Sequence, residues 1–310
     1  MENIEPQQIV KPQQYMHPAL QFLTAIGIMV GLLIAGSLVG LGVAVAVYGM
    51  KIFTAISTQD VTAPHFAGAM WIVQLIGTTL PLLAAALIFA RYIVYDTGEY
   101  IRPGFKFPMV MLLLTTGIMF ASFPAIEFLS NINQKMVLPH FLQWMRDSED
   151  SAEKLTAALL KMDTIWQMLF NLVCIGLFTA IVEEFMFRGV LQTIFLKWTK
   201  SSHAAIWITA IIFSAFHMEF FGFLPRMMLG VLFGYFVVYS GSIWPAVLGH
   251  FINNGTDVVL TYLYQHKQAN IAPDDQHVFN NAGYIISFVI ILFLFWVYRK
   301  VAANKQPVQV

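Results

Sequence analysis

The sequence predicts an all-α, polytopic integral membrane protein, with about eight transmembrane helices around a polar intramembrane cavity. Hydrophobic residues make up 58% of the 310 residues and charged residues only 11%, whereas ordinary soluble domains contain roughly 25% charged residues. The mean hydropathy of the chain is +0.69. Its apolar segments reach the roughly 20 residues that a helix needs to cross a hydrocarbon core about 30 Å thick.

The predicted spans follow one another along almost the whole chain. The short segment Ser240-Gly241-Ser242 separates two of them and indicates a tight helical hairpin. Glycines four residues apart are expected to let neighbouring helices approach closely. The expected spans cover residues 20–49, 66–94, 107–130, 164–196, 204–221, 224–240, 243–263 and 280–299. The glycine pairs are Gly27 and Gly31, Gly36 and Gly40, and Gly230 and Gly234.

The chain divides into four regions. A polar N-terminal segment, 1–18, has no basic stretch and is not expected to be a cleaved signal peptide. Residues 19–160 hold the N-terminal spans, 161–265 the helical core with the polar motifs, and 266–310 a C-terminal span and tail. The connection 131–163 indicates a loop with a short amphipathic helix, either a simple connector or an interfacial helix near the mouth of a site.

The distribution of basic residues predicts the orientation in the membrane. With eight spans both termini lie on one side, and that side carries more lysine and arginine than the other. We therefore expect a multi-pass protein of the cell membrane with cytoplasmic termini. The side of the termini holds Lys11, Arg91, Arg102, Lys106, Lys197, Lys200, Arg299, Lys300 and Lys305. Without the 131–163 segment, the opposite side holds only Lys51, Lys267 and Arg226, which is expected to anchor a helix end at the head groups.

Three charged residues interrupt the fourth predicted span: Glu183, Glu184 and Arg188. A charge at the centre of a membrane helix costs roughly 2.5 to 3.5 kcal/mol on the insertion scale, so a functional reason is expected. Residues four apart share a helix face, and Glu184 and Arg188 should therefore form an ion pair. Glu183 lies about 100° away round the helix and is left to face a polar cavity.

Two of the eight histidines lie clearly within apolar segments, His217 and His250. His250 and Asn254 are four residues apart, so their side chains project from one helix face. At ~1.5 Å per residue, Glu183, His217 and Asn254 lie ~20, ~21 and ~17 Å from the side of the termini. His250 comes out shallower, at ~10 Å. These depths favour a pocket shared by three helices.

These residue types suit hydrolysis. Glu183 would act as general base on a water molecule held jointly with His217. His250 and Asn254 would donate hydrogen bonds to the oxyanion that develops on the attacked carbonyl. This scheme needs no cofactor and no metal. A zinc site formed by Glu183, His217 and His250 is the competing chemistry, because histidine and glutamate are common zinc ligands, although an HExxH motif is absent.

At these residues the chain resembles a known family, the CAAX protease and bacteriocin-processing group of intramembrane endopeptidases, which includes the Ras-converting enzyme. The family pattern is Glu-Glu-xxx-Arg, Phe-xxx-His and His-xxx-Asn on successive transmembrane helices. Here the motifs begin at Glu183, Phe213 and His250, in the family's order, and the resemblance covers roughly 160–260.

The resemblance implies a helical membrane core around a water-filled cavity and a glutamate protease without metal. Glu183 and His217 would activate water, and His250 and Asn254 would form the oxyanion hole. Glu184 and Arg188 would support the site from behind, as their spacing also predicts.

The expected partners are membrane lipid and a peptide or protein substrate, with lipidated CAAX peptides and bacteriocin-related peptides as candidates. The net charge of zero and the lack of a basic stripe argue against nucleic acid. Nothing in the sequence specifies an oligomeric state. Two other classes of function stay open. One is a non-catalytic membrane scaffold or immunity protein on the same fold, and the other is a transporter that uses Glu183, Glu184 and the histidines as a proton relay.

Overall fold

The computed structural model describes residues 16–272, 275 and 277–304. Within these residues the chain forms helices and no strands, so the predicted all-α class is confirmed. Most of the predicted polar segment 1–18, together with Lys11 and Lys305, lies outside the described residues.

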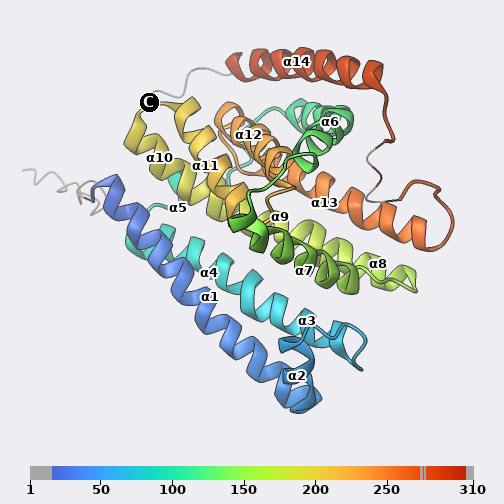
Figure 1. Cartoon of the computed structure of the whole chain (residues 1–310). Helices are drawn as coiled ribbons and strands as arrows, with labels where there is room; N and C mark the ends of the chain where they lie inside the picture. Colours follow the sequence, from blue (N-terminus) through green and yellow to red (C-terminus); the bar gives the residue numbers. More distant parts are fainter. Residues whose placement is uncertain (1–15, 273–274, 276, 305–310) are drawn as a thin grey trace, which may run out of the picture.

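The helices succeed one another along the chain, and the connection between α13 and α14 is long (Figure 1). Several apparently continuous helices contain π-helical turns, labelled η, and η4 is a single 3₁₀ turn. The elements are α1 (Pro18–Tyr48), α2 (Lys51–Ser57), α3 (Phe66–Gln74), η2 (Leu75–Thr79), α4 (Leu80–Ile88), η3 (Phe89–Ile93), α5 (Thr97–Tyr100), α6 (Val110–Gln134), η4 (His140–Leu142), α7 (Gln143–Leu159), α8 (Ile165–Asn171), η5 (Leu172–Phe178), α9 (Thr179–Glu184), η6 (Phe185–Leu191), α10 (Gln192–Thr199), α11 (Ser202–Phe216), α12 (Phe223–Ser240), α13 (Trp244–Gln265) and α14 (Asn281–Ala303).

Each of the eight predicted spans corresponds to helical structure, but only six helices among the described residues are long and apolar enough to cross a membrane. Of the other two predicted spans, α11 has 15 residues and is too short. The second, α13, has 22 residues but is not among the six. The protein is therefore a multi-pass helical membrane protein. The six are Pro18–Tyr48, Phe66–Ile93, Val110–Gln134, Ile165–Thr199, Phe223–Ser240 and Asn281–Ala303.

The motif-bearing helices lie between two peripheral helix pairs. Along one edge of Figure 1, α1 packs against the helix formed by α3, η2 and α4, and at the opposite edge α14 packs against α6. Two of the apolar cores meet at α9. Val182 and Met186 belong to the core shared with α1 and α4, and Ala180 belongs to the core shared with α6 and α12. The acidic segment of α9 is thus held between two packed layers.

The helix that carries the acidic pair is locally unwound on both sides of it. The π-helical turns η5 and η6 directly precede and follow α9. Such turns are rare and occur often at functional sites, since each one widens the helix and rotates the residues beyond it.

The close-packing expectation for glycine holds at some positions and is wrong at others. A β-carbon at Gly234 would lie 2.9 Å from Ile206, so α11 and α12 approach closely there, as they do beside Gly230. By contrast, Gly27 and Gly31 have nothing within 4 Å, because no neighbouring helix covers that face of α1. The predicted hairpin is confirmed, with Gly241 in a left-handed conformation (φ +70°) as the C-cap of α12.

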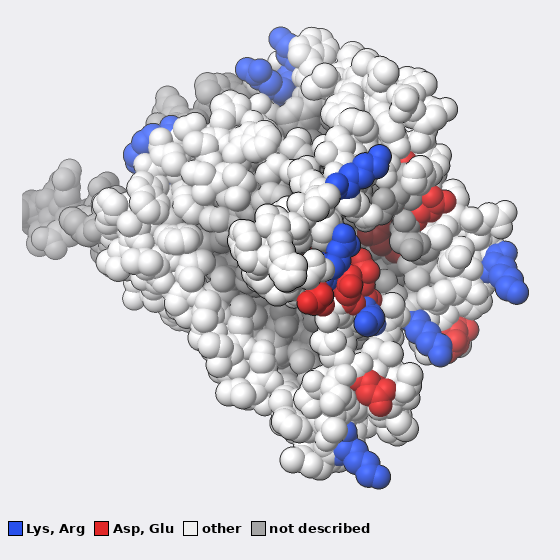
Figure 2. Space-filling model, viewed as in Figure 1, with Lys and Arg blue, Asp and Glu red and all other residues white. Residues whose placement is uncertain are grey.

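The long connection contains a substantial helix, α7, which lies across the front of the molecule in Figure 1. Its residues Thr156 and Leu159 line the cavity described in the next subsection. Figure 2 shows that this face carries few charged side chains, and that the acidic ones gather toward its centre and right-hand side.

Candidate active site

A cavity of about 540 Å³ brings together all four residues predicted to be catalytic. Glu183 comes from α9, His217 from the end of α11, and His250 and Asn254 from α13. Helices outside the predicted motif-bearing core also contribute to the wall. They supply Trp71, Gln74, Leu75, Thr79, Phe123, Ile126, Thr156, Leu159 and Leu160.

Glu183 occupies the middle of this arrangement. Its Oε2 atom is buried and has no hydrogen-bond partner among the described residues. The same atom lies 3.8 Å from Nε2 of His217 and 3.8 Å from Nε2 of His250. Both separations are too long for direct hydrogen bonds. The carboxylate is therefore flanked by two imidazoles and remains able to accept a hydrogen bond.

The hydrogen bond of His217 determines which of its ring nitrogens carries the proton. His217 is the C-cap of α11, and the helix ends there because Met218 adopts a left-handed backbone conformation (φ +57°). Nδ1 of His217 lies 2.8 Å from the carbonyl oxygen of Phe213. A carbonyl only accepts hydrogen bonds, so Nδ1 is the donor and, in the neutral ring, Nε2 is an acceptor that faces Glu183.

His250 is held by a different partner. Its Nδ1 atom lies 2.8 Å from Oε1 of Glu184, and its ring stacks on Phe233 with 5.2 Å between centroids. The shallower membrane depth expected for His250 therefore does not keep it out of the shared pocket, because its ring reaches both glutamates. Counting residues along a straight helix from Ile243 could not include the tilt and starting height of α13.

The predicted ion pair between Glu184 and Arg188 is confirmed. Arg188 Nη1 donates to Glu184 Oε1 over 2.7 Å, and both side chains are 0% exposed. The guanidinium lies over two aromatic rings, 4.1 Å from the centroid of Phe213 and 5.2 Å from that of Phe233. Neither Glu184 nor Arg188 lines the cavity, and Glu184 contacts a cavity-lining residue through its hydrogen bond with His250.

Asn254 reaches the cavity from the helical turn beyond His250. Its Nδ2 donates to the carbonyl of Ile175 over 3.3 Å, and its Oδ1 accepts from Asn253 over 3.2 Å. An amide nitrogen has two hydrogens, so one N–H of Asn254 remains for a further acceptor.

The turn between α11 and α12, residues 217–222, positions His217 and is tied to two other helices. Asn133 of α6 donates to Phe220 O over 2.8 Å and accepts from Leu224 N over 2.6 Å. Glu149 of α7 accepts from the backbone N–H of Phe221 over 2.9 Å. Burial raises the pKa of the Glu149 carboxyl, and the hydrogen bond from Phe221 acts in the opposite direction.

Two further ionisable residues line the cavity that were not predicted as site residues. Arg226, expected at the head groups, lines it beside Gly222, and Asp257 lines it from α13. The only available signal was that each is an ionisable residue near an apolar segment, which favours a functional role by itself.

Within the described part of the chain, no group of three or more histidine, cysteine, aspartate or glutamate side chains is arranged to hold a metal ion. Glu183, His217 and His250, the expected alternative zinc ligands, converge through the two 3.8 Å separations.

Residues 165–256 match the family model of the type II CAAX prenyl endopeptidase Rce1-like proteins. The uncharacterized protein YpbD of Bacillus subtilis (strain 168) is 26% identical over 112 residues, which cover 35% of this chain and 53% of YpbD. The chain thus spans about half the length of the curated relative that it matches. No solved structure shows a significant match. The resemblance predicted from the three motifs is confirmed for this helical core.

Proposed function

We propose that the protein is an intramembrane endopeptidase in which Glu183 and His217 activate a water molecule for attack on a peptide bond. One observation carries the proposal: the buried, unpartnered Oε2 of Glu183 lies 3.8 Å from Nε2 of both histidines, inside a cavity large enough for a peptide segment. The similarity of residues 165–256 to CAAX endopeptidases supports the same reaction class.

The water molecule is bound by two acceptors. Because Nδ1 of His217 donates to Phe213, its Nε2 accepts, and the Glu183 carboxylate also accepts. A water molecule between them donates one hydrogen to each and turns an oxygen lone pair toward the substrate carbonyl. A separation of 3.8 Å suits such a bridge. Glu183 then takes the proton as the bond between oxygen and carbon forms, and delivers it to the leaving amine.

The oxyanion is stabilised from α13. Nδ1 of His250 donates to the carboxylate of Glu184, so Nε2 donates only when the ring carries both protons. Glu184, itself neutralised by Arg188, supports that imidazolium. The remaining N–H of Asn254 supplies the second donor. Donors fixed in place before the reaction are effective because they need no reorganisation when charge develops.

The proposal includes the finer points predicted from the sequence. The reaction proceeds without metal, the substrate is a membrane-associated peptide with CAAX-type or bacteriocin-related peptides as first candidates, and the protein lies in the cell membrane with cytoplasmic termini. The similarity to CAAX prenyl endopeptidases favours prenylated peptides as the first to be tested.

The test compares detergent-purified wild type with Glu183→Gln on a quenched peptide library that includes farnesylated CAAX peptides, with and without a strong zinc chelator. We expect cleavage by the wild type alone and no effect of chelation. Cleavage that is lost on chelation and restored by zinc would contradict the metal-free mechanism. Equal activity of a purified, folded Glu183→Gln variant would exclude Glu183 as the base.

A further inference from the structure

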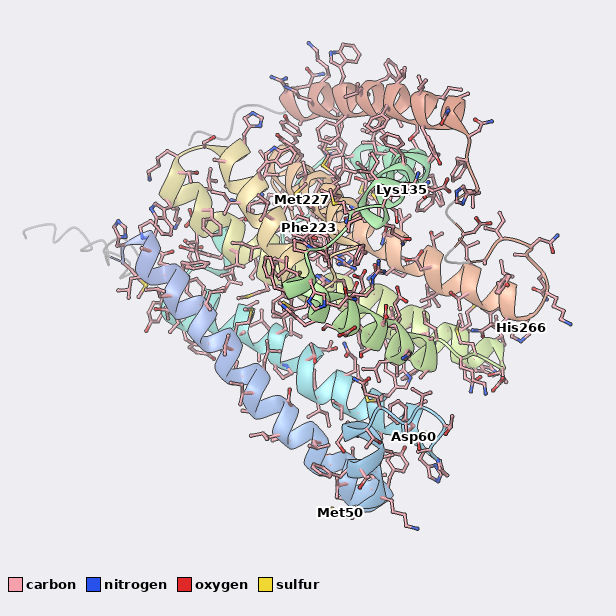
Figure 3. All side chains as sticks on the ribbon, in the orientation of Figure 1. Met50, Asp60, Lys135, Phe223, Met227 and His266 are labelled. Carbon is pink, nitrogen blue, oxygen red and sulfur yellow. The ribbon has the colours of Figure 1, made fainter. Side chains whose placement is uncertain are left out.

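Arg226 lies in the first turns of α12 and lines the same cavity as Glu183 and His217. Its sequence neighbours Phe223 and Met227 are labelled near the centre of Figure 3. Among the described residues that line the cavity, Arg226 is the only lysine or arginine. A cation at this position, within a helix apolar enough to span a membrane, calls for a functional explanation.

The guanidinium of Arg226 has unused hydrogen-bonding capacity. Its Nη2 atom pairs with the carboxylate of Glu219, on the turn before α12. Its Nη1 atom is buried and has no partner among the described residues. Gly222 leaves room for the group, since a β-carbon there would lie 3.2 Å from Nη2 and 3.4 Å from Nη1. Buried donors are nearly always paired in folded proteins, so Nη1 is expected to meet an acceptor from outside the chain.

Arg188 provides an internal comparison. Its Nε and Nη2 atoms also have no hydrogen-bond partner among the described residues. However, its side chain is 0% exposed, and the rings of Phe213 and Phe233 lie beside the guanidinium. The side chain of Arg226 is 22% exposed and is part of the cavity wall. Only Arg226 is therefore placed to contact a bound molecule.

We infer that Arg226 binds a carboxylate of the peptide substrate and so selects peptides with a negative charge close to the cleaved bond. This inference rests on the proposed peptidase function. A guanidinium presents its donors in a planar fork that matches a carboxylate. The surrounding wall, Pro225 and Leu229, is apolar, which strengthens the attraction.

The carboxylate has two chemical sources, the C-terminus of the peptide or an aspartate or glutamate side chain. Three dye-labelled farnesylated peptides of one sequence separate them. The first ends in a free carboxylate, the second in an amide, and the third in an amide with one aspartate next to the terminal residue. We expect the wild type to prefer one of the charged peptides over the neutral amide by about 10- to 100-fold in kcat/KM, chiefly through KM.

Substitutions then assign this preference to Arg226. In Arg226→Gln the ratio between charged and neutral peptides should fall to about 1, and in Arg226→Lys it should be partly retained, since a lysine keeps the charge without the fork. Glu219→Gln removes the competing carboxylate and should increase the ratio. Arg146→Gln is the matched control, because Arg146 lies over the ring of Phe221 but does not line the cavity. Its ratio should equal that of the wild type.

A ratio near 1 in the wild type, or a ratio unchanged in Arg226→Gln, would overturn the inference. Equilibrium binding of the same three peptides to Glu183→Gln, with and without Arg226→Gln, separates this result from failure of the proposed function. Binding that depends on charge and on Arg226, without cleavage by the wild type, leaves the inference standing and removes the peptidase. Cleavage without a charge preference removes the inference and leaves the peptidase standing. If the wild type shows neither cleavage nor a charge preference, both proposals fail.

Discussion

Replacing Glu184 by glutamine should destabilise the protein by about 3 to 5 kcal/mol, because it leaves Arg188 as a buried, uncompensated charge. Both side chains are 0% exposed and 2.7 Å apart. Two donors of Arg188 already lack partners, so beyond this ion pair it retains mainly the faces of two aromatic rings. These rings offset only part of the loss, at about 0.5 to 2 kcal/mol each.

The two partners should not be equivalent. In Arg188→Met, Glu184 keeps His250 as a donor at 2.8 Å, so the carboxylate is still partly compensated. We therefore expect Arg188→Met to be less destabilising than Glu184→Gln. The double variant should be more stable than either single variant, because replacing both members of a buried pair by neutral groups of similar size is often neutral or favourable. The coupling free energy between the two sites should be at least about 2 kcal/mol.

The assay is reversible unfolding in mixed micelles, followed by far-ultraviolet circular dichroism as the fraction of denaturing detergent rises. The control is the pair of Lys197 and Glu99, which has the same 2.7 Å separation with side chains 25% and 42% exposed. Lys197→Met should cost less than about 1 kcal/mol. A cost for Glu184→Gln no larger than that of the control, or a double variant as unstable as the sum of its parts, would refute the reasoning.

Three further predictions concern the structure around the site. Asn133→Ala should lower stability by about 1 to 3 kcal/mol and reduce kcat in a peptide-cleavage assay, since it leaves backbone groups of the turn that carries His217 without partners. Full activity of the variant would show that the turn keeps its conformation without Asn133. Gly234→Ala should destabilise the protein by about 1 to 3 kcal/mol in the same unfolding assay, because its β-carbon meets side chains at 2.8 Å, whereas Gly31→Ala, with open space around it, should have little effect. The raised pKa of Glu149 means that the folded state binds this proton more tightly than the unfolded state, so its contribution to stability is present at acidic pH and lost as pH rises through the shifted pKa. Glu149→Gln should therefore stabilise the protein at neutral pH and reduce the fall in stability with pH, as measured by unfolding midpoints across a pH series.

The sequence predicted that the four candidate catalytic side chains share a pocket, and they line one cavity. This could be predicted because their signals are local. Glu184 and Arg188 pair since they are four residues apart on one helix, and that spacing survives the π-helical turn that begins after Glu184. Charged and imidazole groups in apolar segments are conspicuous because burial is costly. The order of spans and the Gly241 hairpin are likewise properties of short stretches of chain.

The other features of the site depend on tertiary structure and have no local signal in the sequence. Which helices complete the cavity is decided by packing, and the contributions of α3, α6 and α7 to its wall could not be read from their own residues. Arg226 looked like a head-group anchor because its sequence position is a helix end, but that end faces the cavity. The error for Gly27 and Gly31 has the same origin, since a small residue permits close contact and does not supply a neighbour.

The contrasting partners of the two histidines lead to a last prediction. Nδ1 of His217 donates to the neutral carbonyl of Phe213, and its Nε2 is the acceptor in the proposed mechanism, whereas Nδ1 of His250 donates to the carboxylate of Glu184, and its Nε2 acts as a donor in the mechanism through the doubly protonated ring. Glutamine presents an amide N–H but cannot take up a proton. His250→Gln should therefore retain measurable cleavage above His250→Ala, which loses about 10²- to 10³-fold in kcat.

His217→Gln, in contrast, should be as inactive as His217→Ala, because an amide oxygen can orient the water but cannot share its proton. The four variants are compared in kcat on one peptide, after far-ultraviolet circular dichroism has shown that each is folded. Rescue by glutamine at 217 and not at 250 would reverse the roles. It would mean that the hydrogen bonds of the resting site do not set the protonation states in which the two rings act.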